Sequence, residues 1–150
     1  MLLHGFTQTS ASWRPVRAAL GARYKAIAPD LPGHGSFAAR PASFSACDAY
    51  VRVLTRGPFA LAGYSMGGRI ALHAALSAGS RLTRLVLVAA GPGLADPAER
   101  AARRRDAKFR DIAERMGAAL PHARLVVVPG AGHALPLEAP DAVAAALEAA

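Results

Sequence analysis

A serine at position 65 lies between two glycines in residues 63–67, which read Gly-Tyr-Ser-Met-Gly. An apolar run precedes this segment at residues 58–62, and a helical pattern follows it from Met66. A serine on a sharp turn between strand and helix exposes its hydroxyl at the sheet edge, and small residues two places to either side let the backbone turn. The N-terminal amides of the following helix favour negative charge beside the serine. The pattern predicts a nucleophilic Ser65, although the five residues alone would also suit a simple tight turn.

A serine hydroxyl needs a base that takes its proton, and His133 is the candidate. It ends the segment Pro-Gly-Ala-Gly-His at residues 129–133, directly after the aliphatic run at residues 124–128. From a glycine-rich loop past one strand, an imidazole can reach a serine that follows a neighbouring strand. Three other histidines are interpreted as structural residues of loops or helices: His34, His73 and His122.

Residues 2–6, which read Leu-Leu-His-Gly-Phe, are a second place where a strand runs into a glycine turn. The backbone N–H after such a turn can stabilise a developing oxyanion. The amide of Met66, the residue after the serine, is expected to supply the other hydrogen bond.

Five apolar runs are predicted to be strands, and their near-continuous apolar character is typical of parallel strands that are covered on both faces. They are residues 1–4, 24–29, 58–64, 82–89 and 124–129. Helical patterns lie at residues 12–20, 45–56, 66–78, 98–120 and 141–149. The alternation predicts a single α/β domain over residues 1–150, with a doubly wound, mostly parallel sheet and ligands at the carboxyl ends of the strands. The residues at such ends are His4, Asp30, Ser65 and His133.

The composition favours a globular protein that has neither a metal site nor a membrane-spanning segment. The chain has 150 residues, 53% of them hydrophobic, which is enough for one domain with a packed core. Its apolar stretches are too short to span a membrane and the N-terminus has no signal-peptide pattern, so a cytoplasmic location is expected. Cys47 is the single cysteine, and no Cys/His cluster has zinc spacing, so neither a metal nor a cofactor is predicted.

The formal net charge is +8, and eight of the eighteen basic residues lie between Arg100 and Arg124. Acidic residues interleave with them at helical spacing, which favours a solvated face with ion pairs. Nucleic-acid binding is not expected, because neither a recognised module nor aromatic interleaving accompanies the charge. A carboxylated substrate is a further possibility, since arginine binds carboxylates through its forked donors.

Four segments together resemble the α/β-hydrolase superfamily. They read His-Gly-Phe at residues 4–6, Asp-Leu-Pro-Gly-His-Gly-Ser at 30–36, Gly-Tyr-Ser-Met-Gly-Gly-Arg at 63–69 and Gly-Ala-Gly-His at 130–133. Within the superfamily the chain is most similar to the 2-succinyl-6-hydroxy-2,4-cyclohexadiene-1-carboxylate synthase family of menaquinone biosynthesis. That likeness is carried by the Gly-Gly-Arg after the serine, by Gly-Pro-Gly-Leu at 91–94 with Glu-Arg-Ala-Ala-Arg at 99–103, and by Asp-Ala-Lys-Phe-Arg at 106–110.

The resemblance implies a Ser-His-Asp triad that starts proton abstraction and pyruvate elimination rather than hydrolysis. It assigns the base to Ser65, its proton partner to His133 and the acid that orients the imidazole to Asp106. The remaining roles that it implies are substrate-carboxylate binding by Arg69 and Arg103, oxyanion amides at Phe6 and Met66, and a pocket-lining Tyr64. The expected function is therefore a serine-triad enzyme with a small carboxylated substrate. A generic esterase of small esters and a catalytically silent relative that binds a small ligand are the alternatives.

The chain also departs from the family pattern, whose members run to roughly 250 residues in one domain. It opens at what would be the third strand, and the first hairpin, the lid and the acid-bearing strand are expected to be missing. Within the helical pattern at residues 98–120, Asp106 can pair with an arginine one turn away. Asp96 is therefore kept as the substitute orienting acid. An exposed sheet edge at the gap would favour a homo-oligomer.

Overall fold

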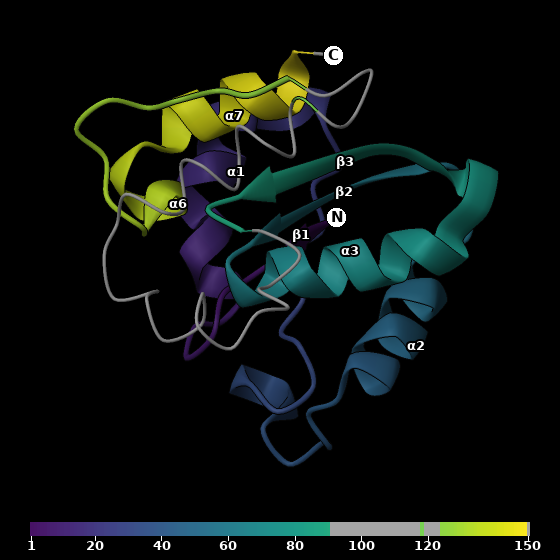
Figure 1. Ribbon diagram of the computed structural model, residues 1–150. Coiled ribbons are helices and arrows are strands. Elements are labelled where there is room, and N and C mark those ends of the chain that lie inside the picture. Colours follow the sequence, from purple (N-terminus) through teal and green to yellow (C-terminus); the bar gives the residue numbers. More distant parts are fainter. Residues whose placement is uncertain (91–117, 119–123, 150) are drawn as a thin grey trace.

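The computed structural model describes residues 1–90, 118 and 124–149 (Figure 1). Its strands and helices are β1 Leu2–Leu3, α1 Arg14–Leu20, α2 Phe44–Leu54, β2 Phe59–Tyr64, α3 Met66–Ala78, β3 Leu82–Val88, α6 Leu135–Glu138 and α7 Pro140–Glu148. Short 3₁₀ turns occur at η1 Ser10–Trp13, η2 Gly21–Arg23, η3 Gly35–Phe37 and η4 Gly79–Arg81. The alternation of strands and helices confirms the α/β class.

Among the described residues, three strands form a parallel sheet in the order β1-β2-β3. The central strand β2 pairs Gly63 with Leu3 of β1 on one side and Tyr64 with Val88 of β3 on the other. Parallel strands end at a common edge, so the turn that follows β2 emerges beside the loop that follows β1. This edge is where the sequence predicts the reactive side chains.

Helices cover both faces of the sheet, and successive strand residues contribute to opposite cores. Leu2 and Ala62 pack with α1 and α7 on one face, whereas Leu3 and Leu61 pack with α2 and α3 on the other. Figure 1 shows these two helix layers on either side of the sheet. Because helices cover both faces, most strand positions carry apolar residues, which explains the near-continuous apolar runs; in β3 only Thr83 and Arg84 interrupt the run.

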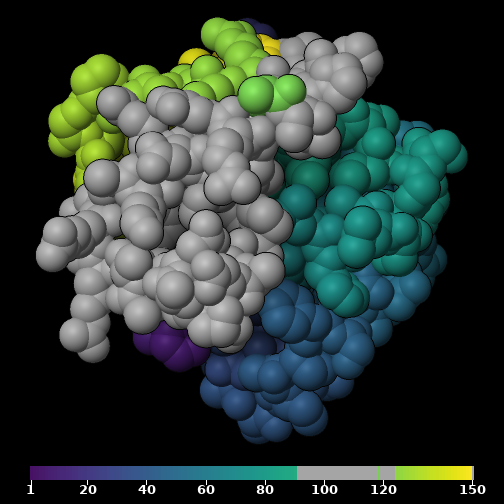
Figure 2. All heavy atoms as spheres, in the orientation of Figure 1, coloured from purple at the N-terminus to yellow at the C-terminus, as the bar shows by residue number. Residues whose placement is uncertain are grey.

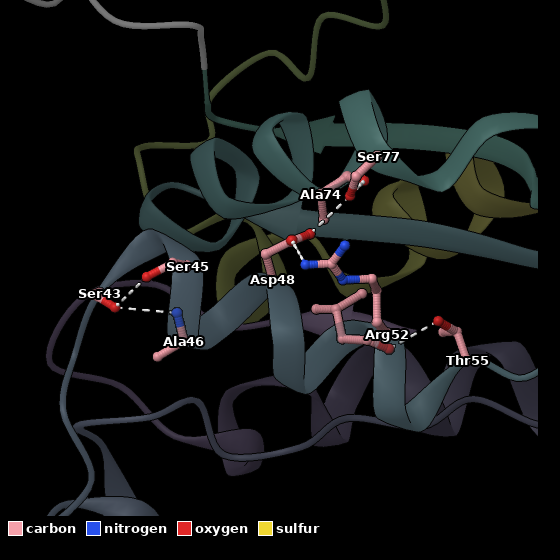
Figure 3. A network of polar contacts seen from close by, with 9 residues as sticks. Ser43, Ser45, Ala46, Asp48, Arg52, Thr55, Ala74 and Ser77 are labelled. Carbon is pink, nitrogen blue, oxygen red and sulfur yellow. Dashed lines mark hydrogen bonds and ion pairs between the residues drawn. The ribbon is translucent and has the colours of Figure 1, made fainter.

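A buried carboxylate joins α2 to α3 (Figure 3). Asp48 accepts a hydrogen bond from Ser77 Oγ of α3 at 3.0 Å and pairs with Arg52, one turn along α2, at 2.6 Å. Ser43 caps the start of α2 by accepting the Ala46 N–H at 3.1 Å. The helix that follows the predicted nucleophile is therefore fixed to its neighbour by a charge-assisted hydrogen bond, from Ser77 to Asp48, as well as by apolar packing.

The structure corrects two of the predicted strands. Residues 24–29 lie beside β1, where the Ile27 carbonyl accepts the Leu2 N–H at 2.8 Å, but they form no strand. Residues 124–129 form no strand either, and the side chains of Leu125, Val126 and Val127 remain 42–47% exposed. Apolar runs become strands only where a neighbour completes the hydrogen-bond ladder, and the described part of the chain completes none for these two segments.

The predicted helix at residues 66–78 has the observed bounds of α3. The helix predicted at residues 98–120 lies outside the described residues except for Ala118, which is helical. No helix within the described part of the chain combines the length and the apolar character needed to cross a membrane.

Candidate active site

Ser65 occupies a strained turn between β2 and α3. Its φ of +51° lies in the left-handed region, which residues other than glycine rarely adopt. Its N–H donates to the Val88 carbonyl of β3 at 2.9 Å, and its carbonyl accepts the N–H groups of Gly68 and Arg69 at the start of α3. The sheet on one side and the helix on the other thus hold the strained backbone in place.

The glycines around Ser65 are required because backbone lies directly against backbone. A Cβ on Gly67 would collide with the carbonyl groups of Leu3 and His4, and a Cβ on Gly63 would collide with the backbone of Gly67. Close approach of β1, β2 and the first turn of α3 is therefore possible only without side chains at these positions. These contacts are the physical reason for the Gly-x-Ser-x-Gly spacing.

The imidazole of His133 reaches Ser65 from the loop before α6. Its Nε2 lies 3.0 Å from Ser65 Oγ, which is hydrogen-bond distance. When the ring proton is on Nδ1, Nε2 accepts the hydroxyl hydrogen, which is the relation between a nucleophile and its base. The Tyr64 ring lies beside the imidazole, with centroids 5.4 Å apart and planes inclined by 47°.

Tyr64 is the last residue of β2 and is 5% exposed. Burial raises the pKa of its phenol, and the negative charge of Glu138 raises it further. The phenol ring is thus buried beside the imidazole of His133, and its role as a pocket-lining residue stays a prediction.

The loop that carries His133 is held by Glu138, the last residue of α6. The Glu138 carboxylate accepts the N–H of Gly132 and, at 3.0 Å, the N–H of Ala134. Sequence reasoning missed this residue. The available signal was a carboxylate five positions after the histidine, near enough to fold back onto a glycine loop.

His4 is fully buried below the loop that follows β1, and its bonds define its tautomer. Nε2 accepts the Leu31 N–H at 3.0 Å, so the proton is on Nδ1, which donates to the Gly5 carbonyl at 2.8 Å. Burial lowers the pKa of His4 most, and the nearby His34 lowers it further, against the opposing effects of the Gly5 carbonyl and Asp30. His4 is therefore a neutral scaffold side chain.

These bonds orient the backbone amide of Phe6. The Gly5 carbonyl accepts both His4 Nδ1–H and, at 3.2 Å, the Gln8 N–H, so its direction is defined. The described residues contain no cis peptide bond, and in a planar trans peptide the Phe6 N–H points opposite to the Gly5 carbonyl. Met66 is the first residue of α3, where N–H groups have no partner within the helix. Both amides thus lie just beyond the carboxyl ends of the neighbouring strands β1 and β2.

Because the folded protein binds a proton at His4 less readily than the unfolded chain does, acid should destabilise it. We expect the free energy of unfolding to fall as the pH drops below about 6.5, the ordinary value for histidine, with a slope of up to about 1.4 kcal/mol per pH unit for one proton. Urea unfolding of wild type and His4→Gln between pH 7 and pH 5 checks this. A His4→Gln variant with the full wild-type slope would contradict the assignment.

Asp30, also at a predicted strand end, joins two loops. Its carboxylate accepts the N–H of Ser10 at 2.7 Å, and the N–H and Oγ–H of Ser36 at 2.8 and 2.9 Å. Hydrogen bonds from the Ser36 and Ser10 backbone hold the pKa of this carboxyl well below its usual range. Asp30 is therefore an ionised loop anchor.

The remaining predicted site residues are only partly described. Arg69 is exposed on α3, one turn after Ser65. Asp106 and Arg103 lie outside the described residues, as do the alternative acid Asp96 and His122.

Within the described ranges, no three His, Cys, Asp or Glu side chains gather to form a possible metal site. The described residues form two hollows. One is lined by α1 and residues 24–26, and the other by residues that include the amino ends of β2 and β3. Both lie away from Ser65 and His133. The space-filling view in Figure 2 shows the described residues in the same orientation as Figure 1.

Comparison with known proteins gives matches over much of the chain. Residues 1–110 match the alpha/beta hydrolase family. The chain is 36% identical over 95 residues to the pimeloyl-[acyl-carrier protein] methyl ester esterase of Nitrosomonas europaea, covering 61% of this chain and 37% of the esterase. It is 36% identical over 112 residues to the 2-succinyl-6-hydroxy-2,4-cyclohexadiene-1-carboxylate synthase of Escherichia coli O157:H7, covering 70% of this chain and 43% of the synthase. The chain thus spans less than half the length of either relative.

Among solved structures, a thermophilic esterase from Thermogutta terrifontis superposes with a TM-score of 0.78 at 20% identity, over 98% of this chain and 86% of the esterase. At this identity the superposition bears on the fold alone, and it agrees with the α/β architecture of the described residues.

Proposed function

Because the chain belongs to the alpha/beta hydrolase family, we propose that it is a serine-dependent enzyme in which Ser65 and His133 perform the chemistry. The observation that carries the proposal is the 3.0 Å contact between Ser65 Oγ and His133 Nε2 beside a strained strand-to-helix turn. The relatives with similar sequences, an esterase and a synthase, support the same class of chemistry.

In this proposal His133 Nε2 takes the hydroxyl proton of Ser65. With an ester, Oγ bonds to the carbonyl carbon, and the carbonyl oxygen gains the electron pair beside the amides of Phe6 and Met66. His133 then gives the proton to the departing alkoxide, and water releases the acyl group. In the elimination, the Ser65 alkoxide takes a proton from carbon, and the electron pair of that C–H bond forms a carbon–carbon double bond as the bond to the leaving group breaks. The leaving group departs as an enolate with the electron pair of the broken bond, and His133 gives it the proton that completes pyruvate.

The substrate class that we favour is a small carboxylated molecule, and the reaction is the synthase-type elimination. Two observations support this choice: the 112-residue similarity to a synthase, and the exposed guanidinium of Arg69 one turn after the serine. Cleavage of a small ester is the second candidate, and the 36% identity to a methyl ester esterase favours it.

Covalent labelling tests the proposal before any substrate is known. Wild type and Ser65→Ala are incubated with a fluorophosphonate, which reacts with activated serines, and the bound probe is located by mass spectrometry. Labelling of wild type at Ser65 alone is expected. A wild-type protein that remains unlabelled would overturn the proposal and favour a catalytically silent relative.

Arg69→Ala should separate the two candidate reactions. We expect kcat/KM for the synthase reaction to fall about 10- to 100-fold, because a charge-assisted contact to a carboxylate is lost. Cleavage of p-nitrophenyl acetate has no carboxylate to bind and should be nearly unchanged. Arg17→Ala, an exposed arginine on α1, is the matched control. Equal losses in both assays would remove the argument for carboxylate recognition.

A further inference from the structure

We propose that Glu138 is a positioning residue of His133, holding the imidazole against Ser65 by binding the backbone on both sides of it. The inference rests on the proposed function, since the role concerns that reaction. Three observations support the inference: two hydrogen bonds from the loop to Glu138, the packing of α6 against the core, and the contact of His133 with Ser65.

The loop before α6 needs an anchor. Residues 129–134 have no helix or strand, Gly130 has a φ of +74°, and His133 is exposed. Such a segment samples many backbone conformations unless side chains restrain it, and ordering it costs conformational entropy at every residue. A base that must remain 3.0 Å from a hydroxyl cannot tolerate that freedom.

The Glu138 carboxylate supplies the restraint with both of its oxygens. Oε2 accepts the N–H of Gly132, and Oε1 accepts the N–H of Ala134 at 3.0 Å. Bonds to an ionised acceptor are about twice as strong as neutral ones. Because they bind the residues immediately before and after His133, they define the direction in which its side chain leaves the backbone.

Glu138 is itself attached to a fixed element. The N–H groups of Leu137 and Glu138 donate to the Ala134 carbonyl at 2.9 and 3.0 Å, which closes the turn of α6. Pro136 is fully buried, and α6 packs against η1, α1 and α7. The Glu138 carboxylate therefore fixes the exposed loop relative to α6, which is packed against the core.

The experiment compares Glu138→Ala and Glu138→Gln with Glu148→Gln, a matched control on α7 that pairs with Arg23. With p-nitrophenyl acetate, kcat of Glu138→Ala is expected to fall about 100-fold with KM nearly unchanged, as for a base displaced by about 1 Å. Glu138→Gln keeps one acceptor oxygen and should lose less. Glu148→Gln should equal wild type. Wild-type kcat in both Glu138 variants would overturn the proposal.

Two further measurements distinguish positioning from general stability. In a His133→Ala background, Glu138→Ala should cause no additional loss of activity, because it acts through the imidazole; a full additional loss would overturn the proposal. Amide hydrogen exchange at Gly132 and Ala134 should accelerate in both Glu138 variants and not in Glu148→Gln, and unchanged exchange would also overturn it. Hydrogen exchange does not depend on turnover. Failure of the serine chemistry, which the labelling experiment would show, is therefore distinguishable from failure of Glu138 to hold the backbone around His133.

Discussion

Replacing His133 by alanine should lower kcat for ester cleavage by about ten-thousand-fold or more. The reason is that the hydroxyl of Ser65 loses the Nε2 acceptor that lies 3.0 Å away, and an unassisted hydroxyl is a poor nucleophile. Since the two side chains act as one unit, Ser65→Ala should cost a similar factor, and the double variant should be no worse than either single variant. Steady-state assays with p-nitrophenyl acetate measure all three.

The matched control is His73→Ala, which removes an exposed histidine from α3 whose ring lies 5.6 Å from that of Phe44. It should turn over at the wild-type rate. If His133→Ala kept most of the wild-type activity, the contact with Ser65 would be structural, and the proposed mechanism would be wrong.

Gly67→Ala should strongly destabilise the fold. The added Cβ would overlap the backbone carbonyls of Leu3 and His4, and these cannot yield easily because β1 is paired with β2 through Leu3 and Gly63. Overpacking typically costs about 1–3 kcal/mol, and an overlap with backbone that cannot move lies at or above the upper end of this range, against the roughly 5–15 kcal/mol that stabilises a domain. Thermal unfolding by circular dichroism should show a markedly lower Tm.

Gly57→Ala is the appropriate comparison, because an added Cβ there meets nothing within 4 Å. It should leave the Tm close to that of wild type. A Gly67→Ala protein as stable as Gly57→Ala would show that β1 and the turn at Ser65 can separate, contrary to the packing described above.

The loops at the reactive edge are held by side chains that bond to backbone. His4 joins the loop after β1 to Leu31, Asp30 joins the segments at Ser10 and Ser36, and Glu138 joins α6 to the loop of His133. Each is a polar group whose backbone partners lie in loops or short 3₁₀ turns, where neither a strand ladder nor an α-helix satisfies their N–H groups. The geometry of the proposed site therefore depends on residues that take no part in the chemistry.

Local pattern was sufficient for several features of this protein. The bounds of α3 and the turn at Ser65 followed from helical periodicity and from glycines at fixed offsets, and both depend on residues close together in the chain. The α/β class followed from the alternation of apolar runs with helical patterns. Residues 24–29 and 124–129 show where this reasoning fails, because strand formation depends on a partner that sequence periodicity does not reveal.

The roles of the polar residues were decided by tertiary structure. From sequence, His4, Asp30 and His133 shared a titratable side chain at the end of an apolar run, and His133 alone of the three was predicted to exchange a proton with Ser65. Only the fold places His4 against the amide of Leu31, 27 residues away, and His133 against Ser65, 68 residues away. Sequence periodicity reports which residues are buried together, whereas the state and task of a titratable group depend on partners brought near it by long-range packing.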